Sequence, residues 1–380
     1  MANSSSAATI ITTAKRQKHC HHHHHHHKDH HHLLIPGLPD HIAQLCLSSI
    51  NPSLLFKVCH SWRRLIYSPS FPSFFSLYAI LSPPKSHHSI QFHNFDPISN
   101  TWKILPPPPQ NTSLQNILLR HPSFLSRNLS VQSISISDNL ILLAATTYNL
   151  SPALSHPLIF NPYEGWSSGP ALATPRRWCV LGTYNGTVYV ASGIGSHFSI
   201  DIAKSMETWD PINNNSIWEK KTEMKDGRFS REAIDAVGWR GKLCMVNVKG
   251  DAAKEGVVYD VEEDTWKEMP EGMLLGFRGP AAAMEEEVMY VVDEGKGILS
   301  RYNPEQDVWE EVFESQRLKG AEQMVAKRGR ICVVSTAGIS VIDIVADPPK
   351  ISVVDLPDGF EPVAVHVLPR MPVTDFAVQV

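Results

Sequence analysis

Length, composition and charge set the first limits on this chain. It has 380 residues, 42% hydrophobic and 19% charged, so it can bury a large core in two or three domains, or in one propeller or solenoid. With neutral histidines the net charge is −4, so nothing in the overall balance indicates a nucleic-acid partner. No apolar run approaches the length of a membrane-spanning helix, so we expect no membrane association.

Cysteine usage and the N-terminus bear on the compartment. The six cysteines are widely separated and form no Cys-x-x-Cys pair, which favours buried thiols in a reducing compartment over a disulfide framework. The N-terminus lacks the apolar core of a secretory signal, and it resembles a transit peptide only weakly because few basic residues precede Asp29. We expect a cytoplasmic or nuclear protein, or one found in both places.

Residues 1 to 32 form a low-complexity segment that contains an unbroken histidine run from His21 to His27. Such a biased composition cannot pack a core, so we predict a disordered tail. Imidazole is a good ligand for nickel and zinc, and the tail would bind these metals in a test tube. We interpret that affinity as incidental, and we predict no metal site and no cofactor for the protein.

The next segment, residues 33 to 74, predicts three short helices. Pro39-Asp40 opens the first helix, with Asp40 as its N-cap or as an acid in its first turn. Asn51-Pro52-Ser53 interrupts the helical pattern, and apolar residues at helical spacing follow it. Three helices within about 40 residues cannot bury this much apolar surface alone, so they need a partner or a neighbouring domain.

A short pattern recurs along the rest of the chain. In "YDVEEDTWKEMP", residues 259 to 270, an aromatic residue is followed by Asp and then, seven positions after the aromatic, by Trp266. Near copies begin at Phe95, Phe160, Trp209 and Tyr302. The tryptophans at positions 102, 166, 218, 266 and 309 lie 64, 52, 48 and 43 residues apart. Periods of about 40 to 50 residues, with four short strands each, are typical of propeller blades.

Each copy has a physical interpretation as strand, turn and strand. The aromatic residue ends one strand and faces the core, and Asp or Asn with Pro builds the turn. The Trp begins the outermost strand, and we expect it to pack between neighbouring blades. Ahead of several hairpins lies an apolar strand entered by a tight turn in which Gly supplies positive φ, as at Asn185-Gly186 and Arg240-Gly241.

Counting the strands gives six units. The second to fifth units supply four strands each, and the sixth keeps the same order without its Trp. The first unit lacks an inner strand, and the spare segment from Pro362 to Pro369 fits that role. A ring closed by the C-terminal strand leaves no free inner edge. We therefore predict a mostly β protein, with a six-bladed propeller over residues 75–380 after the helices at 33–74 and the tail at 1–32.

The repeat over about residues 75 to 369 resembles the kelch repeat. The half of the repeat that contains the aromatic-Asp-Pro turn and the following Trp matches. The double glycine expected after the second strand is reduced to Ser192-Gly193 in the third blade and is absent elsewhere. The helical segment resembles the F-box, most visibly at Leu38-Pro39-Asp40 and Trp62-Arg63. With both in tandem, the sequence resembles the plant family of F-box/kelch-repeat proteins, in which a small α-helical F-box domain precedes a kelch-type β-propeller.

That resemblance implies a function. It implies a non-catalytic substrate-recognition subunit of a Skp–cullin–F-box (SCF) ubiquitin ligase, in which the F-box binds the Skp-type adaptor, and through it the cullin–RING ligase. The propeller would bind the protein to be ubiquitinated. The adaptor-binding residues implied are Leu38, Pro39, Ile42, Cys46, Leu47, Leu54, Leu55, Val58, Cys59, Trp62 and Arg63. The alternative is a kelch interaction scaffold outside any ligase, whose helices cap the propeller.

A basic residue recurs where the inner strand of several blades begins, and aromatic residues accompany some of them. Equivalent positions on a propeller form a ring around the mouth of its channel, and Arg with aromatic residues is typical of binding hot spots. These positions could form a substrate-binding face that favours acidic or phosphorylated groups, or they could brace strand ends by binding carbonyls. The candidate residues are Arg177, Trp178, Arg231, Phe277, Arg278 and Lys319.

A kelch metalloenzyme is a third alternative, which the sequence disfavours. No histidine lies between His197 and His366, so a metal centre on the propeller axis would be short of imidazole ligands. The chain also contains no P-loop. We therefore predict that this chain has no catalytic residue.

Overall fold

The computed structural model describes residues 34–371, except for positions 49, 51, 67, 69–70, 72–74, 84–88, 99, 110–113, 115, 120–130, 213–216, 231–235 and 248–254. The predicted disordered tail lies outside the described residues, and the domain boundaries at residues 32 and 74 stay predictions. No helix in the described part of the chain combines the length and the apolar character that crossing a membrane requires.

Three helices lie where the sequence predicts them: α1 (Asp40–Ser48), α2 (Pro52–Val58) and α3 (His60–Ile66). Asp40 lies in the first turn of α1, and its carboxylate accepts a hydrogen bond from the Leu34 N–H at 3.1 Å. Pro52 is the first residue of α2, where its missing N–H removes no helical hydrogen bond. All of α1 except its last residue falls in a compact unit that ends at Leu47, and residues 48–380 form the other unit.

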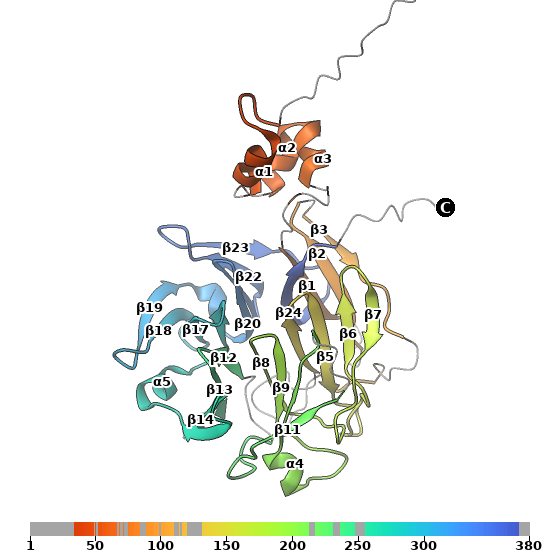
Figure 1. The fold of residues 1–380 in the computed structure, drawn as a ribbon, viewed down its shortest axis with the longest axis vertical. Helices are drawn as coiled ribbons and strands as arrows, with labels where there is room; N and C mark the ends of the chain where they lie inside the picture. Colours follow the sequence, from red (N-terminus) through yellow and green to blue (C-terminus); the bar gives the residue numbers. More distant parts are fainter. Residues whose placement is uncertain are drawn as a thin grey trace, which may run out of the picture. The chain divides into compact units, whose positions relative to one another are not determined.

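The strands of the described residues form six four-stranded antiparallel sheets, the blades of a propeller (Figure 1). Blade 1 contains β24 (Glu361–Pro369), β1 (Phe75–Ser82), β2 (Gln91–Asp96) and β3 (Thr101–Ile104). Blade 2 contains β4 (Val131–Ile136), β5 (Asn139–Ala145), β6 (Leu158–Asn161) and β7 (Gly165–Ser168), and blade 3 contains β8 (Val180–Tyr184), β9 (Thr187–Ala191), β10 (Met206–Trp209) and β11 (Glu219–Lys221). The later blades continue in the same order.

Blade 4 contains β12 (Val237–Trp239), β13 (Lys242–Asn247), β14 (Glu255–Asp260) and β15 (Thr265–Glu268). Blade 5 contains β16 (Ala281–Met284), β17 (Val288–Asp293), β18 (Ile298–Asn303) and β19 (Val308–Glu314). Blade 6 contains β20 (Ala321–Lys327), β21 (Arg330–Ser335), β22 (Gly338–Asp343) and β23 (Lys350–Val354). The prediction of a mostly β fold with six blades is confirmed.

The C-terminal strand closes the ring, as the strand count predicts. β24 pairs antiparallel with β1, with Phe75 opposite Pro369 and Ser82 opposite Glu361. The inner strands β24, β4, β8, β12, β16 and β20 contact one another in succession around the ring. Pairing β24 with β1 therefore gives blade 1 its inner strand and leaves β1 with no free edge.

The recurring tryptophan joins five of the blades to the blade before each of them. Its indole Nε1 donates to a backbone carbonyl that follows the outer strand of the preceding blade, at 2.6 to 2.9 Å. The pairs are Trp102 with Asp355, Trp166 with Pro106, Trp218 with Pro170, Trp266 with Thr222 and Trp309 with Met273. In blade 6, Ile351 lies opposite Ile342 at the position where the other blades have Trp.

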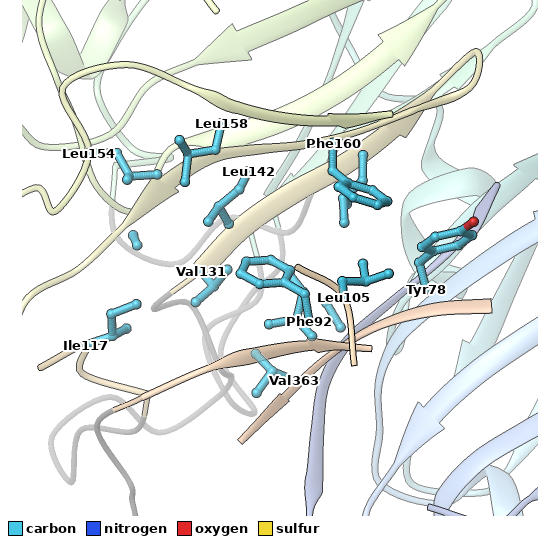
Figure 2. Close-up of a cluster of buried hydrophobic side chains, with 14 of the residues drawn as sticks. Tyr78, Phe92, Leu105, Ile117, Val131, Leu142, Leu154, Leu158, Phe160 and Val363 are labelled. Carbon is cyan, nitrogen blue, oxygen red and sulfur yellow. The ribbon is translucent and has the colours of Figure 1, made fainter. Parts of the chain in front are cut away.

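Hydrophobic cores lie between blades rather than within one blade. Figure 2 shows a core that contains Tyr78 of β1, Phe92 of β2, Leu142 of β5, Phe160 of β6 and Val363 of β24. Side chains of the first blade, the second blade and the C-terminal strand therefore share one buried cluster. Blade 1 cannot complete this core without the last strand of the chain.

Candidate functional site

The predicted adaptor-binding residues on the helices differ in exposure. Ile42, Leu54 and Val58 are 37%, 57% and 59% exposed although all three are apolar. Leu47 and Leu55 are buried. The helices therefore leave large apolar side chains in solvent, a feature that is typical of partner-binding surfaces.

The other predicted adaptor-binding residues are mostly accessible. Pro39, Cys46 and Cys59 are exposed, whereas Leu38, Trp62 and Arg63 are half-buried. Their roles in adaptor binding stay predictions.

Arg63 also has a structural role. Its guanidinium donates to the Phe56 carbonyl and lies over the Phe56 ring at 4.7 Å, so it ties α3 to α2. Leu65 and Ile66, at the end of α3, are buried. A substitution of Arg63 would therefore affect the helices themselves as well as any partner.

The second candidate site lies in the connections at one end of the blade sheets. Because neighbouring strands are antiparallel, the connection that enters each inner strand lies at the same end as the connection between the second and third strands. Arg177, Arg278 and Lys319 all lie in connections that enter an inner strand. Arg231 lies outside the described residues.

Arg177 and Arg278 occupy equivalent positions on blades 3 and 5. Each lies three residues before its inner strand, β8 or β16. The Ile194 N–H donates to the Arg177 carbonyl at 2.9 Å, and the Glu294 N–H donates to the Arg278 carbonyl at 3.1 Å. The repeat therefore places the two arginine backbones alike.

The side chains at these equivalent positions have different surroundings. Arg177 is 8% exposed and stacks on the Trp178 ring at 3.9 Å, and Trp178 has a φ of +53°, which is rare for a bulky residue. Arg278 is exposed, as is Lys319. Phe277 is 1% exposed and packs edge-to-face on Trp309. The structure brings Arg278 and Lys319 to the surface and places Arg177 and Phe277 inside the protein.

Arg176, which is not among the predicted site residues, forms a buried ion pair in blade 3. The Arg176 guanidinium pairs with the Glu207 carboxylate of β10 and donates to the Ser192 carbonyl at 3.1 Å and to Ser205 Oγ at 2.9 Å. In this blade a buried arginine thus braces a strand end. Glu207 in the fully buried strand β10 could have indicated this pair, because a buried carboxylate needs a cation.

No group of three or more His, Cys, Asp or Glu side chains in the described ranges could hold a metal ion. Residues 165 to 169 have the Gly-x-Ser-x-Gly spacing of a nucleophile elbow. They lie on and just beyond the outer strand β7, not at the turn from a strand into a helix that an elbow needs.

Two histidines of blade 1 are buried. His366 of β24 lies 2.9 Å from Ser133 Oγ of blade 2, and burial lowers the pKa of His366 to about 3. His93 of β2 lies 3.1 Å from Gln91 Oε1, and burial lowers its pKa as well. Both are therefore neutral core residues at physiological pH.

Comparison with known proteins gives several relatives in Arabidopsis thaliana, although no family model matches the chain. The F-box/kelch-repeat protein SKIP25 is 53% identical over 360 residues, which are 90% of this chain and 91% of that protein. The F-box protein AFR is 28% identical over 69% of each chain. The F-box/kelch-repeat protein At4g39590 is 23% identical over 76% of this chain and 71% of that protein.

Proposed function

Since this chain belongs to the F-box/kelch-repeat family, we propose that it is the substrate-recognition subunit of an SCF ubiquitin ligase. The F-box binds the Skp-type adaptor, and through it the cullin–RING ligase, while the kelch propeller binds the protein to be ubiquitinated. The chain supplies no catalytic group, and it acts by raising the effective concentration of substrate lysines near the ubiquitin-loaded enzyme. It does so in the cytoplasm, the nucleus or both.

The exposed apolar side chains of the helices carry this proposal. Ile42, Leu54 and Val58 are partly in solvent, and burying their exposed area in an interface would gain part of the about 1.5 to 3 kcal/mol that full burial of such a side chain contributes. In the alternative scaffold, the helices only cap the propeller, and a cap would bury its apolar side chains within the chain. Leu54 and Val58 lie in the same compact unit as the propeller and are nevertheless exposed, which favours a separate partner.

The topology of blade 1 favours substrate binding at the end of the propeller away from the point where the chain enters it. The chain enters the propeller at Phe75, which pairs with Pro369 at the end of β24. The connections with Arg278 and Lys319 lie at the other end of the sheets, where inner strands begin. A protein bound to those connections would leave the entry point of the chain free.

Adaptor binding by the full-length chain tests the proposal. In the Leu54→Asp/Val58→Asp variant we expect affinity for a purified Skp-type adaptor to fall more than about 100-fold, because two apolar contacts become buried charges. The matched control is Ile104→Asp/Ile217→Asp, which changes two exposed apolar residues of the propeller. A folded wild-type chain that binds no adaptor, or equal binding by both variants, would favour the scaffold.

A further inference from the structure

Four exposed cations lie in neighbouring connections of blades 5 and 6, and we call them the blade 5–6 rim: Arg278, Lys296, Arg317 and Lys319. We propose that this rim binds an acidic segment of the protein that the propeller recognises. The inference rests on the proposed function. The substrate would then contact two neighbouring blades instead of a whole ring of blades, and Lys296 and Arg317 join the candidate substrate-binding residues.

Backbone hydrogen bonds join the three connections that carry the rim. These connections are residues 269–280, which enter blade 5, residues 294–297, between β17 and β18, and residues 315–320, which enter blade 6. The Glu294 N–H donates to the Arg278 carbonyl at 3.1 Å, and the Gly320 N–H donates to the Glu294 carbonyl at 2.8 Å. Glu294 thus links the backbone at Arg278 to the residue that follows Lys319.

Gly297 allows the second and third connections to approach closely. It has a φ of +77°, and a Cβ added there would lie 2.4 Å from the Ser315 carbonyl oxygen and 3.1 Å from Lys319 Cγ. The Ser315 N–H also donates to the Gly297 carbonyl at 2.9 Å. Any side chain at position 297 would separate the two connections, so glycine is what brings Lys319 against the β17–β18 connection.

The backbone at the remaining two cations is fixed as well. The Asp293 carboxylate accepts from the Lys296 N–H at 3.0 Å, and Ser335 Oγ donates to the Arg317 carbonyl at 2.9 Å. The rim backbone is therefore ordered before any partner arrives, which lowers the entropy lost on binding.

The rim cations have no acidic partner within the described part of the chain, whereas several other surface cations do. Arg240 pairs with Glu287, and Arg301 pairs with Glu310. The three rim connections hold four cations and two acids, Glu271 and Glu294, on a protein whose net charge is −4. The side-chain ends of the rim cations are therefore available to an external anion.

The two ends of blade 5 have opposite charge. The turn between β16 and β17, at the end away from the rim, carries Glu285, Glu286 and Glu287. An acidic segment is repelled from that end and attracted to the rim, so charge gives both steering and orientation. Nucleic acid is also a polyanion. Proteins that bind it contact many phosphates along an extended basic surface, and the rim is too short for such contacts.

The test measures peptide binding to the full-length chain in complex with its adaptor, by fluorescence anisotropy at low and at physiological ionic strength. The probes are a short polyglutamate peptide, its polyglutamine counterpart, a peptide with phosphoserines in place of the glutamates, and a single-stranded oligonucleotide. We expect either anionic peptide to bind at least about tenfold more tightly than polyglutamine. Comparing the two anionic peptides tells whether carboxylate or phosphate is the preferred group.

Two charge-reversal variants locate the site. Arg278→Glu/Lys319→Glu should lose at least about tenfold in affinity for the anionic peptides, while Lys103→Glu/Lys220→Glu, on exposed outer strands, should stay within about twofold of wild type. Both variants change the net charge equally, and thermal melting checks that both are folded.

Three outcomes would overturn the proposal. They are no preference of the wild-type chain for an anionic peptide, equal losses in the two charge-reversal variants, and tighter, rim-dependent binding of the oligonucleotide. Retention of the adaptor by the same sample separates these outcomes from failure of the ligase role, which would appear as loss of the adaptor itself.

Discussion

Blade 1 and blade 5 have the same four-stranded antiparallel order, but the chain builds them in different ways. In blade 5 the strands β16 to β19 follow one another, and short turns join them. In blade 1 the inner strand β24 comes from the C-terminus and pairs with β1 from the start of the propeller. A turn fixes the register of a hairpin, whereas no turn joins β24 to β1.

Blade 1, which lacks this turn, buries more polar side chains than blade 5 does. Blade 1 buries Ser76, His93, Asn94, Asp96 and His366, among others. In the range from Ala281 to Glu314, which is blade 5, every buried residue of the described structure is apolar or aromatic, or is a glycine. Burying a polar group is unfavourable unless a specific partner satisfies it, so these groups restrict how their strands can pair.

The partners of β24 show which register is selected. Tyr78 donates its hydroxyl to the Pro369 carbonyl at 2.8 Å, and Arg370 donates two hydrogen bonds of 3.1 Å to the Asp96 carboxylate. From blade 6, the Gln323 amide binds both the carbonyl and the N–H of Val365, at 2.9 and 3.0 Å. A slip of one residue would break all of these bonds and turn the apolar side chains of β24 to the wrong faces.

Blade 5 depends on local contacts instead. Trp309 packs against Tyr302 of the neighbouring strand and against Phe277. The Asp307 carboxylate, in the turn before Trp309, accepts from the Tyr302 hydroxyl at 2.6 Å and from the Gly272 N–H at 2.8 Å. Turn chemistry therefore specifies the hairpins of blade 5, whereas buried polar pairs specify β24, which arrives from far along the chain.

Removing β24 should have the largest effect. Deleting residues 361–380 removes Val363, Ala364, Val365, Val367 and Leu368 from the core. Each buried Val or Leu side chain contributes about 1.5 to 3 kcal/mol, and their sum is comparable to the entire stability of a typical domain. We expect loss of soluble, cooperatively melting protein, as measured by yield and by circular dichroism.

A shorter deletion is the control for this experiment. Removing residues 372–380 leaves β24 intact and should leave the melting transition in place. Cooperative melting of the longer deletion near the wild-type temperature would show that β24 is dispensable for closure.

Separating the polar pair at the end of β24 should have the next largest effect. Arg370→Met removes the bidentate partner of the buried Asp96 carboxylate, and we expect the free energy of unfolding to fall by about 3 kcal/mol. Denaturant unfolding measures the change. The double variant Asp96→Asn/Arg370→Met should recover part of the loss, because no buried carboxylate then remains.

The matched change in blade 5 is Trp309→Phe. It keeps an aromatic ring but removes the hydrogen bond from Nε1 to the Met273 carbonyl, and we expect a loss of about 1 to 2 kcal/mol. A larger loss for Trp309→Phe than for Arg370→Met would contradict the view that polar pairs matter most where the chain closes.

The difference between local turns and contacts across the fold also explains which features could be predicted from the sequence. The blade count and the closing strand followed from local patterns, because the Trp period and the unpaired segment at Pro362 to Pro369 can both be found along the chain. Register at the closure could not be predicted, because it depends on Asp96 meeting Arg370 across the fold. The three N-terminal helices were predictable from their apolar spacing and from the break at Pro52.

The candidate substrate residues were predictable only in part. The recurrence of basic residues predicted that Arg177, Arg278 and Lys319 lie in connections that enter inner strands, with Arg177 and Arg278 at equivalent backbone positions. It could not give their exposure. Arg177 is buried and stacks on the Trp178 ring, and the sequence does not reveal the positive φ of Trp178. Phe277 follows the six-residue helix α5 (Glu271–Gly276), which has too few residues for a periodic signal and directs Phe277 into the core.

His366→Gln should change stability least at neutral pH, but it should change how stability depends on pH. Burial holds its pKa at about 3, against about 6.5 in an unfolded chain. Above pH 6.5 the side chain is neutral in both states, so His366→Gln should change stability little there if Gln keeps the contact with Ser133. Below that pH the unfolded chain binds a proton that the native state excludes, so wild-type stability falls as the pH decreases toward 3.

His366→Gln should therefore make stability depend less on pH between about 6.5 and 3. Melting temperatures across this range measure the dependence, with Trp309→Phe as a control that should lower stability while keeping the wild-type slope. Some slope should remain in His366→Gln, because burial also lowers the pKa of His93. An unchanged slope would mean that His366 does not contribute to the acid sensitivity, and would remove this difference between β24 and blade 5.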